Sequence, residues 1–180
     1  MVNNIVQNNH EQQEEIREWV NWNRNFNTHP EEMTKEQVVA LEMLDVSLKP
    51  LDPIPDSLEL LSNLKVLYLY ETNLNELPEI IGKLRSLTKL WLTGNKLKEL
   101  PHTIGDLQNL KELRADRNQL TSLPDSFANL SELTKLDLED NKLTDCPDVV
   151  NKLKNLKELY LRGNELSVKI DSVKGNYIKS

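Results

Sequence analysis

The chain has 180 residues, a length that suits one compact domain or a short array of repeats. Its net charge of −7 argues against non-specific binding to nucleic acid and against docking on an anionic membrane surface. The single cysteine, Cys146, excludes an internal disulfide and a zinc site of the CxxC type. The first residues lack a basic segment followed by a continuous apolar run, so we expect a cytoplasmic protein without a secretory signal peptide or membrane span. Export by a signal-independent route stays open.

Two helices are expected before residue 43. Apolar residues recur at helical spacing on one side of residues 10–27, with glutamates on the other side. These apolar residues are Ile16, Trp19, Val20, Trp22 and Phe26. A capping box at 34–37, with Met33 and Val38 in the positions of a hydrophobic staple, predicts a second helix from Lys35 to about Glu42. We interpret both helices as a cap on the core that follows, with docking of a partner on Trp19 and Trp22 as the alternative.

Leucine-proline pairs then recur with a fixed period. They stand 23 residues apart at 77–78, 100–101 and 123–124, and Ile54-Pro55 and Cys146-Pro147 fall on the same grid. The frame is L-x-x-L-x-L-x-x-N-x-L-x-x-L-P, and six copies fit between Leu41 and Ile170. The clearest copy consists of Leu87, Leu90, Leu92, Asn95, Leu97, Leu100 and Pro101. A repeat of this length indicates a solenoid.

The frame resembles the leucine-rich repeat family. The second half of two units reads P-x-x-I-G-x-L, with Pro78, Ile81, Gly82 and Leu84 in one and Pro101, Ile104, Gly105 and Leu107 in the next. This pattern is similar to the 23-residue subclass found in Ras-pathway scaffold proteins, plant intracellular Ras-group proteins and many bacterial proteins. The resemblance implies an α/β right-handed solenoid with a parallel concave sheet of about six strands and an N-terminal α-helical cap. We accordingly divide the chain into a helical cap (1–40), the repeats (41–170) and a C-terminal tail (171–180). Fold alone does not identify a ligand.

The inward positions of the frame predict the core. Leucines at alternate positions are typical of a strand with one buried face, and the proline that follows each strand blocks further pairing. An asparagine column is expected to turn inward and to bond backbone groups at the bend. It consists of Asn95, Asn118, Asn141 and Asn164. Thr72 and Lys49 replace it in the first two units, where we expect a looser turn. Cys146 occupies a leucine position and is interpreted as a small core residue.

The outward positions are the candidate binding surface. Tyr68, Tyr70, Trp91 and Arg114 fall close together in consecutive units, and these residue types dominate binding hot spots. An acidic zone follows, with arginines around it. The full set of candidate partner-binding residues is Tyr68, Tyr70, Trp91, Arg114, Asp116, Arg117, Asp137, Glu139, Tyr160 and Arg162, with Asp140 beside them. A second outward column alternates in sign, which favours cross-strand pairs that fix the register: Lys89, Glu112, Lys135 and Glu158.

No catalytic, cofactor or metal motif is found in the chain. Its three histidines do not combine into a nucleophile–base arrangement, and the phosphate-binding glycine motifs are absent. Calcium is disfavoured because the carboxylates project from different strands without an organising loop. We therefore predict a protein–protein interaction module rather than an enzyme. Its concave face is expected to bind a protein or peptide partner that carries an apolar spot beside a basic strip. The alternatives are a self-associating structural protein and a secreted effector-type protein of the bacterial kind. A monomer is expected, with a weak dimer through the C-terminal edge as the other outcome.

Overall fold

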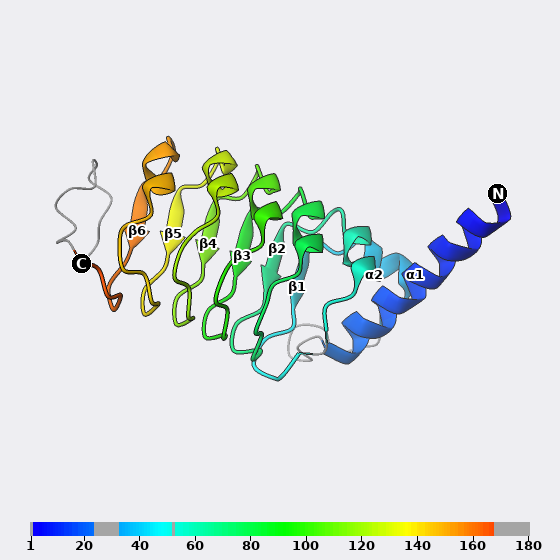
Figure 1. The fold of residues 1–180 in the computed structure, drawn as a ribbon. Coiled ribbons are helices and arrows are strands. Elements are labelled where there is room, and N and C mark those ends of the chain that lie inside the picture. Colours follow the sequence, from blue (N-terminus) through cyan, green and yellow to red (C-terminus); the bar gives the residue numbers. More distant parts are fainter. Residues whose placement is uncertain (1, 24–32, 52, 168–180) are drawn as a thin grey trace.

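The computed structural model describes residues 2–23, 33–51 and 53–167. Its body is a row of stacked coils, each with one short strand on one side and a short helical turn on the opposite side (Figure 1). A long helix, α1, covers the beginning of the row and extends past it. This is the solenoid that the period predicts.

Six parallel strands of the described residues form one sheet in the chain order β1-β2-β3-β4-β5-β6. The strands are β1 Met43–Asp45, β2 Val66–Tyr68, β3 Lys89–Trp91, β4 Glu112–Arg114, β5 Lys135–Asp137 and β6 Glu158–Tyr160. Each residue pairs with the residue 23 positions further on, as Leu67 does with Leu90 and Leu90 with Leu113. Because successive side chains of a strand point to opposite faces, the central leucine of each strand is buried while its two neighbours face outward.

Within the described ranges, the opposite wall consists of five 3₁₀ helices, each directly after a proline. They are η1 Asp56–Leu60, η2 Glu79–Lys83, η3 His102–Asp106, η4 Asp125–Asn129 and η5 Asp148–Lys152. The prolines have extended backbone, which ends the preceding segment and starts the turn. Neighbouring turns pack very closely: a Cβ added to Gly105 would overlap the backbone oxygen of Ser126. Only a glycine fits there.

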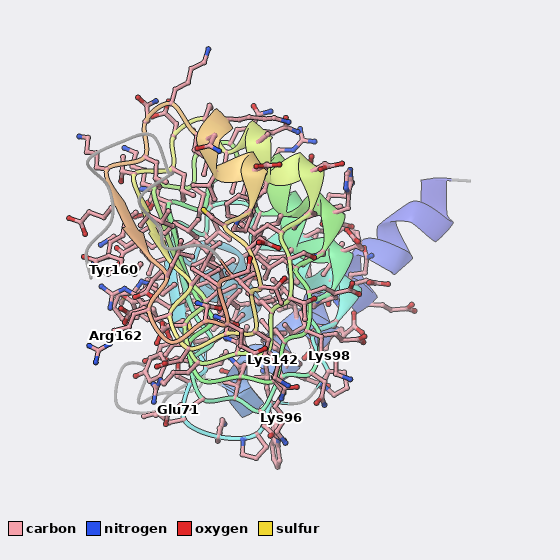
Figure 2. All side chains as sticks on the ribbon, turned by 60° about the vertical axis from the view of Figure 1, so that its left-hand side comes forward. Glu71, Lys96, Lys98, Lys142, Tyr160 and Arg162 are labelled. Carbon is pink, nitrogen blue, oxygen red and sulfur yellow. The ribbon has the colours of Figure 1, made fainter. Side chains whose placement is uncertain are left out.

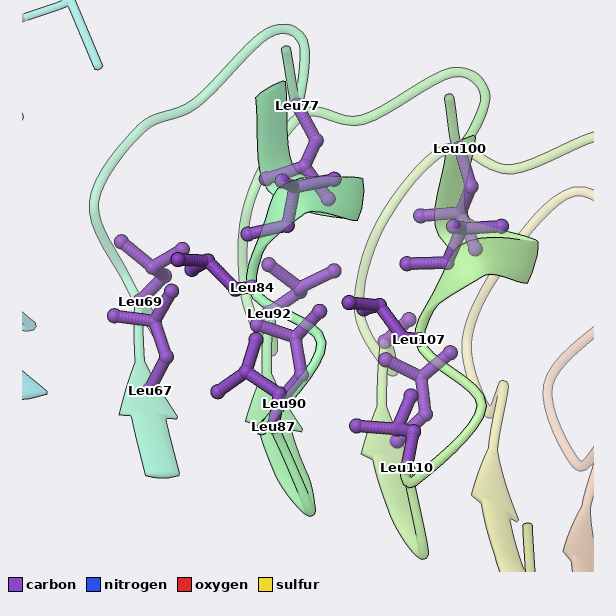
Figure 3. Close-up of a cluster of buried hydrophobic side chains, with 14 of the residues drawn as sticks. Leu67, Leu69, Leu77, Leu84, Leu87, Leu90, Leu92, Leu100, Leu107 and Leu110 are labelled. Carbon is purple, nitrogen blue, oxygen red and sulfur yellow. The ribbon is translucent and has the colours of Figure 1, made fainter. Parts of the chain in front are cut away.

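The core lies between the sheet and this wall. The leucines of the frame fill it in layers, and Figure 3 shows the side chains from successive units in contact. Leu87, Leu90 and Leu92 are fully buried. Since no single unit encloses its own leucines, stacking of neighbours is what buries them. Cys146 is half-buried against this core, and burial raises the pKa of its thiol.

The structure confirms the role predicted for the asparagine column. Asn95 Nδ2 donates to the carbonyls of Leu69 and Leu92 at 2.7 and 2.9 Å, and its Oδ1 accepts the Leu74 N–H at 3.0 Å. Asn118, Asn141 and Asn164 repeat the pattern. The looser turn expected at Thr72 is wrong. Thr72 is buried, its hydroxyl donates to the Leu69 carbonyl at 3.0 Å, and its N–H donates to Oδ1 of Asn95 in the next unit at 3.1 Å.

The N-terminal helices differ in extent from the prediction. Helix α1 is Val2–Asn23, beginning earlier than expected, and α2 is Lys35–Val39, ending earlier because β1 begins at Met43. The capping box of α2 is present. Phe26, the last expected apolar residue of the first helix, lies outside the described residues.

One side of α1 packs on the core, as expected for a cap. Ile16, Trp19 and Val20 are buried there, whereas Trp22 is 73% exposed, so its assignment to the same side is wrong. Trp22 lies about 240° around the helix from Ile16, outside the buried arc. The expected C-terminal tail, 171–180, also lies outside the described residues, and the division of the chain into cap, repeats and tail stays a prediction.

Candidate functional site: the outer face of the sheet

The sheet presents its outward side chains in three rows that cross the strands. The strand pairing places Asp45, Tyr68, Trp91, Arg114, Asp137 and Tyr160 in one row and Met43, Val66, Lys89, Glu112, Lys135 and Glu158 in another. The third row, just beyond the strands, holds Ser47, Tyr70, Thr93, Asp116, Glu139 and Arg162. We call these three rows the sheet face. The 23-residue period thus aligns side chains that are far apart in sequence.

The aromatic cluster predicted from the sequence is assembled on β2 and β3. The ring centroids of Tyr68 and Trp91 are 4.6 Å apart, and those of Tyr68 and Tyr70 are 6.5 Å apart in an edge-to-face arrangement. All three rings are partly exposed. Burial, followed by the charge of Asp45, raises the pKa of the Tyr70 phenol, so this hydroxyl stays protonated at neutral pH. The cluster is a preformed apolar surface with polar tips.

Arg114 completes the cluster. Its guanidinium carbon lies 4.1 Å from the centre of the Trp91 ring, within range of a cation–π interaction. Its Nε donates to Glu112 Oε1 at 2.7 Å, and Lys89 approaches the other oxygen of Glu112 at 3.8 Å. Trp91 Nε1 is buried and has no hydrogen-bond partner among the described residues. Trp91 is therefore packed between Tyr68 and Arg114, while its indole N–H has no partner among the described residues.

The acidic zone lies on β5 and just beyond the ends of β4 and β5. Asp137 is half-buried, and Oδ1 accepts the Glu139 N–H at 3.2 Å. Burial raises the pKa of Asp137, and the nearby charges of Asp116 and Glu139 raise it further, although the backbone hydrogen bond from Glu139 and the positive charge of Arg114 oppose the shift. Asp116 accepts a hydrogen bond from Thr93 Oγ1 at 2.6 Å. Among the residues that the structure describes, Asp137, Glu139 and Asp140 have no ion-pair partner.

The last strand carries a separate group. The Tyr160 hydroxyl donates to Glu158 Oε2 at 2.8 Å, and Lys135 lies 5.4 Å from the Tyr160 ring centre. Arg162 is exposed at the same end of the sheet face (Figure 2). Tyr160 pairs with Asp137 across β5 and β6, so Tyr160 and Arg162 border the acidic zone of the predicted set, while they lie two strands or more from the aromatic cluster.

Two contacts were not predicted. Glu71 and Arg117 form an ion pair of 3.3 Å across two units, passing over Gly94. Gly94 has φ +69, and a Cβ there would lie 2.9 Å from the Glu71 side chain. A glycine between opposite charges in one column is the signal that could have revealed this pair. The second is the bond of Arg114 to Glu112, which sits beside the predicted Lys89–Glu112 and Lys135–Glu158 pairs.

Neither metal-binding nor membrane-spanning features emerge from the described ranges. No group of three or more histidine, cysteine, aspartate or glutamate side chains is positioned there to hold a metal ion. Within the same ranges, no helix has the length and apolar character needed to cross a bilayer.

Comparison with known proteins identifies the family. Residues 52–179 match the family described as leucine-rich repeat region, and the chain belongs to the leucine-rich repeat family. No curated protein matches the chain.

Three solved structures show the same architecture. A leucine-rich repeat protein of Leptospira interrogans is 33% identical, with a TM-score of 0.75 over 80% of this chain and 38% of that one. The plant peptide hormone receptor RGFR1, in complex with RGF2, is 32% identical, with a TM-score of 0.64 over 71% of this chain and 22% of that one. An internalin of Listeria monocytogenes is 26% identical, with a TM-score of 0.57 over 67% of this chain and 35% of that one. The chain thus spans well under half the length of each.

Proposed function

We propose that the chain is an interaction module that binds an extended protein or peptide segment on the sheet face, without catalysing a reaction. The observation that carries this proposal is the cluster of Tyr68, Trp91 and Arg114 on a face that is mostly polar beyond Met43 and Val66 on β1 and β2. Aromatic and arginine side chains supply most of the energy at protein interfaces, because they bury a large area at a low cost in conformational entropy. Similarity to a receptor whose structure holds a peptide hormone supports the same class of ligand.

The local geometry suits binding in two further ways. Tyr68 is fixed between two aromatic neighbours, and Arg114 is fixed by Glu112 and Trp91, so few rotamers are lost when a ligand arrives. The indole N–H of Trp91 is an unsatisfied donor. After a small side-chain rotation, a backbone carbonyl of a bound segment would accept its hydrogen bond.

The proposal is tested by selecting a displayed library of random peptides on the full chain. A variant with Tyr68→Ala, Trp91→Ala and Arg114→Ala removes the cluster. The matched control changes three exposed residues of the opposite wall, Lys83→Ala, Asp106→Ala and Lys152→Ala, and alters the net charge by the same amount.

Selected peptides should bind the wild type and the control equally and lose at least about tenfold in affinity for the cluster variant. Failure to enrich any peptide, or equal binding to the cluster variant, would refute the proposal. Arg114→Gln, which retains side-chain methylenes over Trp91, serves as the second variant if the triple variant does not fold.

Self-association is the second candidate, and the edge of β6 favours it. The N–H groups of Leu138 and Asp140 donate to the carbonyls of Tyr160 and Arg162, so each strand is bonded by the next. Among the described residues no strand follows β6, and a sheet edge with unpaired backbone groups invites pairing with another chain. Light scattering over a concentration series decides: a rise in mass supports an assembly, and a constant monomer mass refutes it.

A further inference from the structure

The ligand class follows from how charge is compensated on the sheet face. In the half formed by β3 and β4, the cations are neutralised internally. Glu112 binds Arg114 and contacts Lys89, and Arg117 contacts Glu71 and Asp116. No cation of this half is left to attract an acidic ligand.

The charges in the half around β5 are compensated differently. Asp137 and Glu139 have no ion-pair partner within the described ranges, and Asp137 is half-buried beside two further carboxylates. Arg114 lies beside Asp137 in register and its charge lowers the pKa of Asp137, but burial and the neighbouring carboxylates outweigh it. Arg162, one strand beyond Glu139, is exposed and forms no ion pair with it among the described residues. Placing carboxylates next to one another in a partly desolvated position is unfavourable unless a cation approaches them.

The aromatic half shows how this face accommodates a cation. Arg114 stacks its guanidinium on Trp91 while a carboxylate binds its Nε, which is the combination of aromatic ring and carboxylate that an arginine prefers. Asp137 stands in the same row as Arg114, one strand further on. It offers the carboxylate for a second guanidinium, which would have to come from outside the chain.

Distances across the strands set the spacing in such a ligand. Adjacent strands lie about 4.8 Å apart, so Trp91 and Asp137 are separated by about 10 Å and Tyr68 and Asp137 by about 14 Å. An extended peptide advances about 3.3 Å per residue. A peptide that crosses the strands would therefore reach both places with side chains about three or four residues apart.

Resting on the proposed function, we infer that the ligand is an extended peptide segment with an aromatic or aliphatic side chain on Tyr68 and Trp91 and, three or four residues away, an arginine or lysine on Asp137 and Glu139. The apolar side chain fixes the register, and the cation forms the ion pair that Asp137 and Glu139 lack among the described residues. An acidic segment would place further negative charge beside these carboxylates, so it is disfavoured.

The test is the residue composition of the peptides selected as above, followed by binding of synthetic copies. Peptides that depend on the aromatic cluster should carry arginine or lysine at the stated spacing. Replacing that residue by glutamate should weaken binding at least about tenfold, and raising the salt concentration should weaken the basic peptide and not the glutamate version.

Two charge-neutralised variants locate the contact. Asp137→Asn with Glu139→Gln keeps side-chain shape and should abolish the preference for the basic peptide. Asp106→Asn with Asp125→Asn, which neutralises two exposed carboxylates of the opposite wall, should leave the preference intact.

The two proposals fail separately. Peptides that need the aromatic cluster but carry no basic residue, or whose preference survives Asp137→Asn with Glu139→Gln, would overturn this inference and leave the interaction module standing. Peptides indifferent to the cluster would overturn the module itself.

Discussion

Replacement of Asn95 by alanine should destabilise the solenoid more than the loss of any single exposed hydrogen bond. The Asn95 side chain satisfies four backbone groups: it accepts from the N–H groups of Thr72 and Leu74 and donates to the carbonyls of Leu69 and Leu92. The site is buried, so water cannot take over these bonds. At about 1 kcal/mol for each bond, and with the bonds not fully additive, the free energy of unfolding should fall by roughly 3–5 kcal/mol.

Asn109→Ala is the matched control. Asn109 is exposed, and its side chain donates one hydrogen bond of 2.9 Å to the Arg85 carbonyl, so its loss should cost about 0.5–1 kcal/mol. Both variants are compared with the wild type by urea denaturation followed by circular dichroism. A cost for Asn95→Ala within about 1 kcal/mol of that for Asn109→Ala would refute the role assigned to the asparagine column.

Three further predictions concern charge, close packing and the cap. Asp137→Asn should raise the melting temperature at pH 7, because a pKa that is raised in the folded state means that the carboxylate destabilises the fold above that pKa. The gain in melting temperature should vanish as the pH falls toward the ordinary pKa of 3.8. An equal gain at pH 7 and at the low pH would contradict this. Gly105→Ala should cost about 1–3 kcal/mol in urea denaturation, because the new methyl overlaps the Ser126 backbone, and a neutral effect would show that the turns can separate. Trp19→Ala should cost about 3–5 kcal/mol and Trp22→Ala under about 0.5 kcal/mol, since the first is buried and the second exposed; similar costs would contradict the orientation of α1.

The sequence determines the rows of the sheet face but not the contacts within them. The 23-residue period places Tyr68 beside Trp91 and Trp91 beside Arg114, because parallel pairing in register converts a spacing in sequence into a neighbour in space. The period does not determine which neighbouring cation each carboxylate of the sheet face pairs with. Glu112 has Lys89, Arg114 and Lys135 within one strand of it, and only the rotamers of the folded chain select the first two.

The cap shows a second limit of the sequence. Helical spacing identified Ile16, Trp19 and Val20 as a buried group, yet the same pattern also included Trp22. The width of the buried arc depends on how the helix lies against the first unit, and spacing alone does not contain that information. Similarly, Gly94 reads as a turn residue in the sequence, whereas the ion pair of Glu71 with Arg117 above it depends on the fold.

The most direct test of the interaction module uses the three tryptophans of the chain as reporters. Each indole N–H gives one resonance in a nitrogen-edited NMR spectrum, and Trp91→Phe assigns the one on the sheet face. On titration with a selected peptide, the Trp91 resonance should shift until the protein is saturated, because the unsatisfied Nε1 lies in the proposed contact. The resonance of the buried Trp19 should not shift. If a peptide binds and the Trp91 resonance does not shift, the central claim that the sheet face is the binding surface is contradicted.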